Sequence, residues 1–169
     1  MRGFVPDLRG ARVMVIPLQS RTGLSDDVDS EISFALESRG EGIDWVFPDE
    51  VADILARSPG LDVPLEALPV GMFLTREVNR VGDPLYGHLL RVAAVTNAQI
   101  ALIPVEARRR VELDGSSVVE VVTTLLNVRT GRVLWFAVVE GQPGKAGDFQ
   151  IVASAVDALA SRLLWYMND

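Results

Sequence analysis

The chain has 169 residues, of which 49% are hydrophobic and 23% are charged, and its net charge is −7 at pH 7. This length and composition fit one globular domain with a sizeable core, and they exclude global disorder. The negative charge repels phosphate backbones, so a nucleic-acid role would require a strongly localised basic patch. The sequence contains no cysteine, which excludes disulfides, thiolate metal sites and a cysteine nucleophile.

The start of the chain shows no signal for export or membrane insertion. Residues 1–8 lack the apolar segment of a signal peptide. No stretch approaches the roughly 18 apolar residues of a membrane-spanning helix. We therefore expect a single domain over residues 1–169, with residues 1–10 as an N-terminal extension and no transmembrane segment.

The first half of the chain alternates between strand and helix patterns. Runs rich in β-branched and other apolar residues predict a buried strand over 11–18 and a shorter one over 43–47. Apolar residues at helical spacing predict a helix over 28–38, after the polar loop 19–27. A proline followed by two acids opens another helix over 48–57. A right-handed crossover would make the two strands parallel.

Residues 61–84 form an irregular apolar segment. Their large apolar side chains are too numerous for a free linker, whereas the prolines and glycines prevent one long helix. We expect short helical pieces and an ordered loop here, followed by an amphipathic helix over 85–96.

The second half reads as a strand meander and a last helix. Three strands are predicted over 100–112, 117–128 and 132–140, with hairpin turns between them, and a helix over 149–167. The element order is β-α-β-α-α-β-β-β-α. The predicted fold class is α/β (α+β), a single-domain mixed β-sheet of about five strands with helices packed on it.

The chain resembles the CsgG/TolB N-terminal-domain group, which includes lipoprotein activators of penicillin-binding proteins. The resemblance rests on a strand with a proline near its end (13–18) and on the polar loop 21–27 before a helix. It also rests on residues 96–99, which lead into the strand 100–104, and on the penultimate hairpin 127–135.

The resemblance implies a compact α/β domain of the bacterial cell envelope, with a protein-binding role and no cofactor. Members are usually exported, often through a lipobox cysteine, and this sequence has no cysteine. We expect a protein peripheral to a bacterial membrane, on the periplasmic side if a leader has been removed and otherwise cytoplasmic. Its partners would be subunits of a larger membrane-associated assembly.

An acidic cluster and the one histidine support an alternative hypothesis, a small metal-dependent enzyme. It would use Asp26, Asp27 and Asp29 together with His88. The spacing is not that of an EF-hand, and neither a phosphate-binding glycine motif nor a nucleophile elbow is present. Helix capping and solvation are the better explanation of the carboxylates, because they lie where a helix start favours negative charge. We therefore predict no catalytic, cofactor-binding or metal-ligating residue and no enzyme activity.

Three consecutive arginines form the sharpest basic cluster. On a strand, Arg108 and Arg110 point to one side and Arg109 to the other. The first pair either contacts an acidic protein or lipid headgroups, or is balanced on a solvated face by Glu106 and Glu112. Arg109 requires an acidic partner unless it lies beyond the edge of the core.

Aromatic residues are the better indication of function. Trp135 and Phe136 are adjacent on a strand and must face opposite sides of the sheet. Trp165 lies off the apolar stripe of the last helix, so it is either an interface anchor or is covered by residues 61–84. Phe73 either closes the core or belongs to a docking patch.

The leading hypothesis is a non-catalytic protein-binding accessory or scaffold subunit of a bacterial envelope or membrane-associated complex. The candidate anchors of its interface are Phe73, Trp135, Trp165 and Tyr166. Arg108 and Arg110 would steer the partner electrostatically. An unpaired sheet edge could also pair with a strand of the partner.

Overall fold

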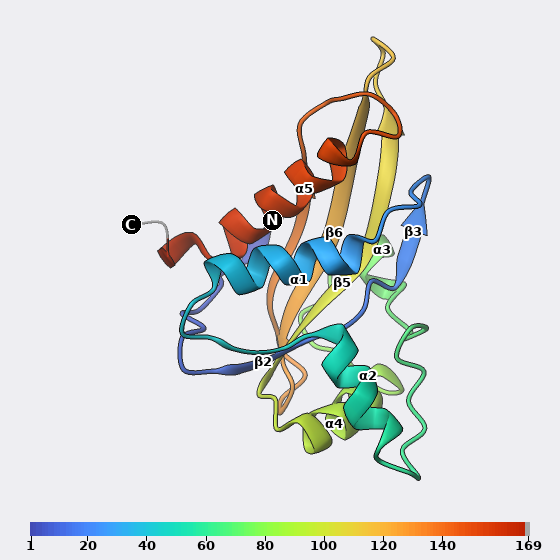
Figure 1. Ribbon diagram of the computed structural model, residues 1–169. Coiled ribbons are helices and arrows are strands. Elements are labelled where there is room, and N and C mark those ends of the chain that lie inside the picture. Colours follow the sequence, from blue (N-terminus) through green and yellow to red (C-terminus); the bar gives the residue numbers. More distant parts are fainter. Residues whose placement is uncertain (168–169) are drawn as a thin grey trace.

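A seven-stranded mixed sheet runs through the molecule, and helices cover both of its faces (Figure 1). The computed structural model describes residues 1–167. The strands are β1 (Arg2–Gly3), β2 (Arg12–Val15), β3 (Ser20–Thr22), β4 (Asp44–Val46), β5 (Ile100–Val111), β6 (Ser117–Asn127) and β7 (Val133–Glu140). The helices are α1 (Val28–Arg39), α2 (Pro48–Ala56), α3 (Met72–Thr75), α4 (Leu85–Thr96), α5 (Phe149–Leu163) and the 3₁₀ helix η1 (Trp165–Met167).

The strand order in the sheet is β1-β7-β6-β5-β2-β4, and β3 pairs with the upper part of β5. The strand β2 is parallel to both β4 and β5, as expected for crossover connections through helices. The meander β5-β6-β7 is antiparallel, and β5 and β6 extend into a long hairpin (Figure 1).

Each face of the sheet has its own apolar core. On one face, α1 and α5 pack over a cluster that includes Val15, Leu102, Leu125 and Trp135. We call it the α1/α5 face. On the opposite face, α2, α4 and the segment 61–84 pack over a second cluster, which includes Met14, Ile103 and Leu126. We call it the α2/α4 face.

The predicted fold class and most predicted elements are confirmed. The helix α4 has the predicted bounds, and the first two predicted strands, β2 and β4, are parallel. Asp27 caps α1 by accepting a hydrogen bond from the Ser30 N–H at 3.1 Å. The last helix ends earlier than expected, at Leu163, and continues as η1.

Two strands were missing from the prediction, which gave about five. The strand β1 lies within residues 1–10, and Val5 and Leu8 of the same segment are buried in the α1/α5 core. This segment is therefore integrated into the fold. The strand β3 lies within the expected polar loop 19–27 and pairs with β5, and a periodicity argument does not find it because all three of its side chains are polar and exposed.

The segment 61–84 is ordered as expected, with one short helix, α3, and a loop. Its apolar residues Leu65, Leu68 and Val70 enter the α2/α4 core. The amide side chain of Gln19 holds it, donating to the Leu65 carbonyl at 2.9 Å and accepting from the Leu68 N–H at 2.7 Å. None of the helices within residues 1–167 has the length and apolar character needed to cross a membrane.

Candidate protein-binding surfaces

Two of the predicted interface anchors are core residues. Phe73 is 3% exposed and packs in the α2/α4 core, which makes the segment around it a cover for that core. Trp135 is 1% exposed and lies in the α1/α5 core, while Phe136 packs against the opposite one, so the prediction that they face opposite sides is confirmed. The prediction that Phe73 and Trp135 are interface anchors is therefore corrected: in each case a covering layer of the fold shields the ring from water.

Arg108 and Arg110 lie in an ion-pair network on the upper part of the α2/α4 face. Glu120 of β6 accepts from Arg108 at 2.7 Å and from Arg110 at 2.8 Å. The expected partners Glu106 and Glu112 are also present, and Glu140 joins from β7. Because the network sets two arginines against four glutamates, it has no excess positive charge that could attract an acidic partner.

Arg109 points to the other side of β5, as predicted, but its partners are not acidic. Its guanidinium donates to the Gly23 carbonyl and to the Ser117 hydroxyl, both at 3.1 Å. The residue is half-buried, at the margin of the α1/α5 core. Of the two expectations, the position beyond the edge of the core is the one that the structure shows.

An exposed aromatic surface forms where the two ends of the chain meet. Phe4 is 66% exposed and Trp165 is 45% exposed, and their ring centroids lie 5.1 Å apart in an edge-to-face arrangement. The indole N–H of Trp165 donates to the Val5 carbonyl at 3.2 Å. With the exposed Met1, these side chains border a cavity of about 300 Å³. We call Met1, Phe4 and Trp165 the terminal aromatic surface.

Tyr166 supports this surface from behind. Its hydroxyl accepts a hydrogen bond from the Leu8 N–H at 3.0 Å, and its ring contacts Trp165 edge-on at 5.7 Å. The Arg9 guanidinium stacks over the same ring. The segment 61–84 does not cover Trp165; residues near the N-terminus do so in part.

The residues of the metal-enzyme alternative do not converge. Asp27 caps α1, and Asp29 accepts from the Leu18 N–H at 2.8 Å, both at the start of a helix on the α1/α5 face. His88 belongs to α4 on the opposite face, where its Nδ1 lies 2.7 Å from Arg91. Within residues 1–167, no group of three or more His, Asp or Glu side chains could hold a metal ion. The metal-enzyme alternative requires these side chains to converge in one pocket, and they do not.

A crevice between α1 and α2 was not predicted. It has a volume of about 480 Å³ and opens beside the ends of β2 and β4, where Pro17, Phe47 and Pro48 line it. The chain leaves β2 toward the α1/α5 face and leaves β4 toward the α2/α4 face. The two connections thus diverge at adjacent parallel strands, which is where open α/β sheets have their crevices. We call this cavity the α1–α2 crevice.

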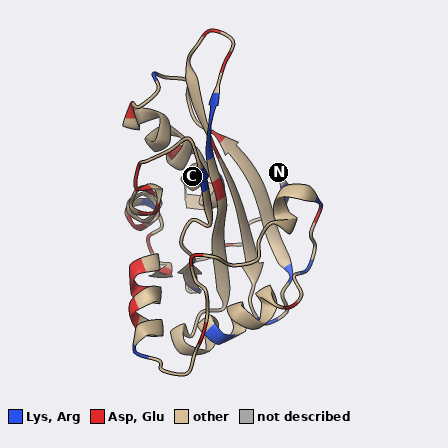
Figure 2. Ribbon diagram, turned by 90° about the vertical axis from the view of Figure 1, so that its right-hand side faces the viewer, with Lys and Arg blue, Asp and Glu red and all other residues tan. Residues whose placement is uncertain are grey.

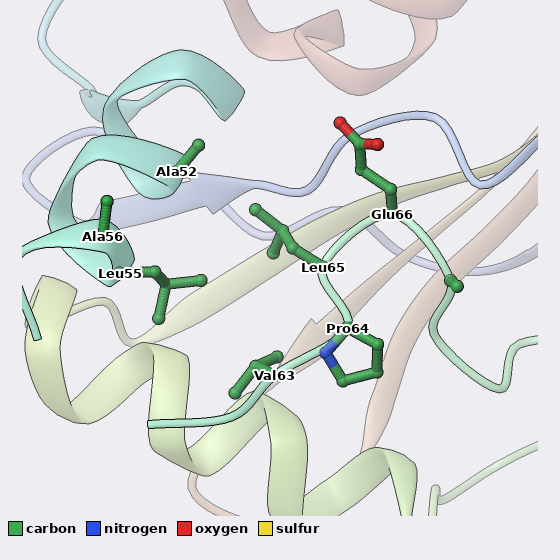
Figure 3. Close-up of a pocket in the computed structure, with 8 residues that line it drawn as sticks. Ala52, Leu55, Ala56, Val63, Pro64, Leu65 and Glu66 are labelled. Carbon is green, nitrogen blue, oxygen red and sulfur yellow. The ribbon is translucent and has the colours of Figure 1, made fainter. Parts of the chain in front are cut away.

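A second, more apolar hollow adjoins the crevice, and the two share Ala52, Leu65 and Glu66. Its volume is about 530 Å³. Figure 3 shows Ala52 and Leu55 of α2 on one side of it, and Val63, Pro64 and Leu65 of the loop on the other. We call it the α2 shelf. The Gln19 hydrogen bonds to Leu65 and Leu68 hold its loop wall in place.

The lining of the α1–α2 crevice is acidic. Its charged residues are Asp27, Asp29, Glu37, Asp49 and Glu66, and none of its lining residues, all within the described part of the chain, is Lys, Arg or His. Figure 2, in which the ribbon is red at Asp and Glu, shows acidic positions on the helices along one side of the molecule. Burial raises the pKa of Asp29, against the hydrogen bond from Leu18, and the charges of Asp27 and Glu66 raise it further.

One sequence signal could have indicated the crevice. Phe34 is 70% exposed on α1, at the crevice, although a helix over a core usually turns its large apolar residues inward. Phe34 lies off the apolar stripe of Val28, Ile32 and Leu36, and this departure from the helical spacing is the signal. The acids of α2 were assigned to the helix dipole, which they also favour.

The comparisons with known proteins connect this chain to solved structures of the same fold. No protein-family model matches the sequence, and a comparison with curated proteins found no match. The PelC dodecamer from Paraburkholderia phytofirmans is similar, with a TM-score of 0.55 and 20% identity over 95% of this chain and 92% of the PelC chain. In a second crystal form, a PelC variant gives 0.55 and 18%.

The LpoB C-terminal domain from Salmonella enterica is also similar, with a TM-score of 0.51 and 18% identity. The similarity covers 79% of this chain and 84% of that domain. At such identities the likeness concerns the fold. The predicted structural resemblance to the CsgG/TolB N-terminal-domain group, with its lipoprotein activators, is thereby confirmed.

Proposed function

We propose that this protein is a non-catalytic, protein-binding accessory or scaffold subunit of a bacterial cell-envelope or membrane-associated complex. The observation that carries the proposal is the terminal aromatic surface, in which Phe4 and Trp165 stay exposed although they contact each other. Exposed large aromatic side chains beside a cavity are typical anchors of protein interfaces.

The geometry supports an interface with a fixed shape. Trp165 is oriented by its hydrogen bond to Val5, and Tyr166 by its bond from Leu8, so both rings lose little freedom on binding. The likeness in fold to the PelC dodecamer and to a domain of LpoB supports the part of the proposal that places this protein in the cell envelope. Assembly of this chain with other subunits is part of the proposal.

Co-isolation from the native source tests the proposal. Tagged wild-type chain is recovered from detergent-solubilised membranes and from cytosol, and each fraction is separated by size. We expect co-migration with one large complex at fixed stoichiometry. The double substitution Phe4→Ala with Trp165→Ala should release the chain from that complex, because it removes both exposed rings.

Phe149→Ala is the matched control, since Phe149 is exposed to a similar degree on α5. It should leave co-migration unchanged. Migration of the wild type as a free species near 18.4 kDa in every fraction would contradict the proposal. Retention of the double variant in the complex would remove the terminal aromatic surface as its basis.

A further inference from the structure

The α1–α2 crevice has the position of a ligand site. It lies at the carboxyl ends of the parallel strands β2 and β4, where the chain turns to opposite faces of the sheet. Crevices at such points are the usual binding places of open α/β sheets, because two diverging connections leave a gap that no helix fills. The gap here is bounded by α1, α2 and the loop around Leu65.

The charge of the crevice selects its ligand. Its five carboxylates form no ion pair with any Lys or Arg of residues 1–167, in contrast to the glutamates of the sheet network. The hydrogen bonds from Ser30 lower the pKa of Asp27, and the charge of Arg21 adds to this and opposes the rise at Asp29, but the Arg21 guanidinium donates to the Asp26 carbonyl. An anionic ligand would be repelled from this crevice, and a cationic one attracted.

Apolar surface beside the carboxylates defines the ligand further. Phe34 stands exposed at the crevice, and Phe47 and Leu65 line it. The α2 shelf continues this surface past Leu55 and Val63 (Figure 3). A simple metal ion would use none of it, and the described residues hold no metal-ligating group. A peptide segment with cationic and apolar side chains would use both features.

We propose that the α1–α2 crevice binds a cationic segment of a partner protein, with lysine or arginine among its carboxylates and an apolar side chain against Phe34. The inference rests on the proposed function, because it requires a protein partner, but it uses a different surface. The α2 shelf would receive the next apolar side chain of the segment. Burial of Asp29 leaves its charge poorly solvated, which a bound cation would relieve.

A defined peptide tests the proposal. The probe is a fluorescent synthetic peptide of about fifteen residues, with leucines at helical spacing and lysines elsewhere. Its counterpart carries glutamate in place of lysine. Fluorescence anisotropy with the full chain should show saturable binding of the lysine peptide, weaker at high salt, and no binding of the glutamate peptide.

Substitutions in the crevice should weaken that binding. Asp49→Asn with Glu66→Gln removes two crevice charges and should raise the Kd by about tenfold. Phe34→Ala should raise it by about fivefold, and because the ring is exposed the fold should persist. The matched controls are Glu41→Gln with Glu50→Gln, which changes the net charge equally outside the crevice, and Phe149→Ala. Each control should change the Kd by less than about twofold.

Three results would overturn the proposal. The first is that the lysine peptide does not bind. The second is that the crevice and the control double substitutions weaken binding equally, which would indicate attraction to the overall negative charge. The third is concentration-dependent self-association that the crevice variant abolishes, because the occupant would then be a second copy. If co-isolation succeeds while the peptide fails to discriminate, the proposed function stands and the crevice inference falls.

Discussion

The two halves of the α2/α4 face of the sheet differ in the exposure of their side chains to water. Near α2 and α4, β5 presents Ala101 and Ile103 to a dry apolar core. Farther along the same strand, toward the hairpin tip, the same face presents Arg108 and Arg110. Both arginine side chains remain more than two-fifths exposed, whereas the apolar pair is fully buried.

The comparison shows that a covering layer, and not the strand, decides the chemistry of a sheet face. Helices and the segment 61–84 cover the first half, so burial of apolar area stabilises it at about 25 cal/mol per Å². The second half stays open, and charged cross-strand pairs keep it soluble while adding modest stability. A partner that docks on this second half would have to desolvate the ion-pair network.

The largest expected effect lies in the covered half. Phe73→Ala should lower the free energy of unfolding by about 3 kcal/mol, because it leaves a cavity beneath the segment 61–84. Urea denaturation measures the change. Phe34→Ala, at an exposed ring, should change stability by less than about 0.5 kcal/mol. Similar losses for both variants would mean that Phe73 does not close the core.

A smaller effect is expected at the centre of the open half. Burial raises the pKa of Glu120, but the hydrogen bond and charge of Arg108, with the charge of Arg110, lower it below the ordinary value of 4.5. The folded protein therefore binds this proton less readily than the unfolded chain. The stabilisation is present above pH 4.5 and is lost as pH falls through the lowered pKa.

Glu120→Gln should accordingly destabilise the protein by about 1 kcal/mol at neutral pH, since its arginine partners are partly exposed. The deficit should shrink in acid, because the wild type then loses the same charge. Chemical denaturation across a pH series measures both. Glu41→Gln, at an exposed position outside the network, is the control. A deficit that grows in acid would show that the ion pairs are not its origin.

The smallest effect is expected at the hairpin tip beyond the network. Leu113 is fully exposed there, so Leu113→Ser should change the free energy of unfolding by less than about 0.5 kcal/mol. Thermal unfolding of the two proteins side by side is a sufficient measurement. A loss above about 1 kcal/mol would mean that the tip packs on other residues, and the open half would then be shorter than described.

Local sequence patterns were enough for most elements. The helix α4, the parallel pair β2 and β4 and the meander follow from periodicity, turn residues and crossover rules. The network was also predicted in part, because Glu106 and Arg108 alternate with Ala107 on β5. These features depend on residues close in sequence, which a single chain reveals directly.

The tertiary structure decided where the alternation of inward and outward side chains along β5 shifts by one residue. A bulge between Pro104 and Glu106 places Val105 in the α2/α4 core, although it sits beside Glu106 on the same face. Pro104, which has no backbone N–H to donate to the ladder, marks a place where a bulge is tolerated, but the pairing of β5 with β6 sets the shift there. The burial of Phe73 and Trp135 was likewise undecided, because each depends on a distant segment that covers it.

By itself, therefore, the sequence determined a mixed α/β fold, the order of its elements apart from β1 and β3, and the absence of a recognisable catalytic motif. The tertiary structure decided which aromatic rings stay exposed, which charges are paired and where the crevice lies. Propensity and periodicity act within a few residues, and they specify local elements. Exposure and cavities depend on tertiary packing: Phe4 meets Trp165 from the opposite end of the chain, and the crevice forms because α1 and α2, although near in sequence, pack on opposite faces of the sheet.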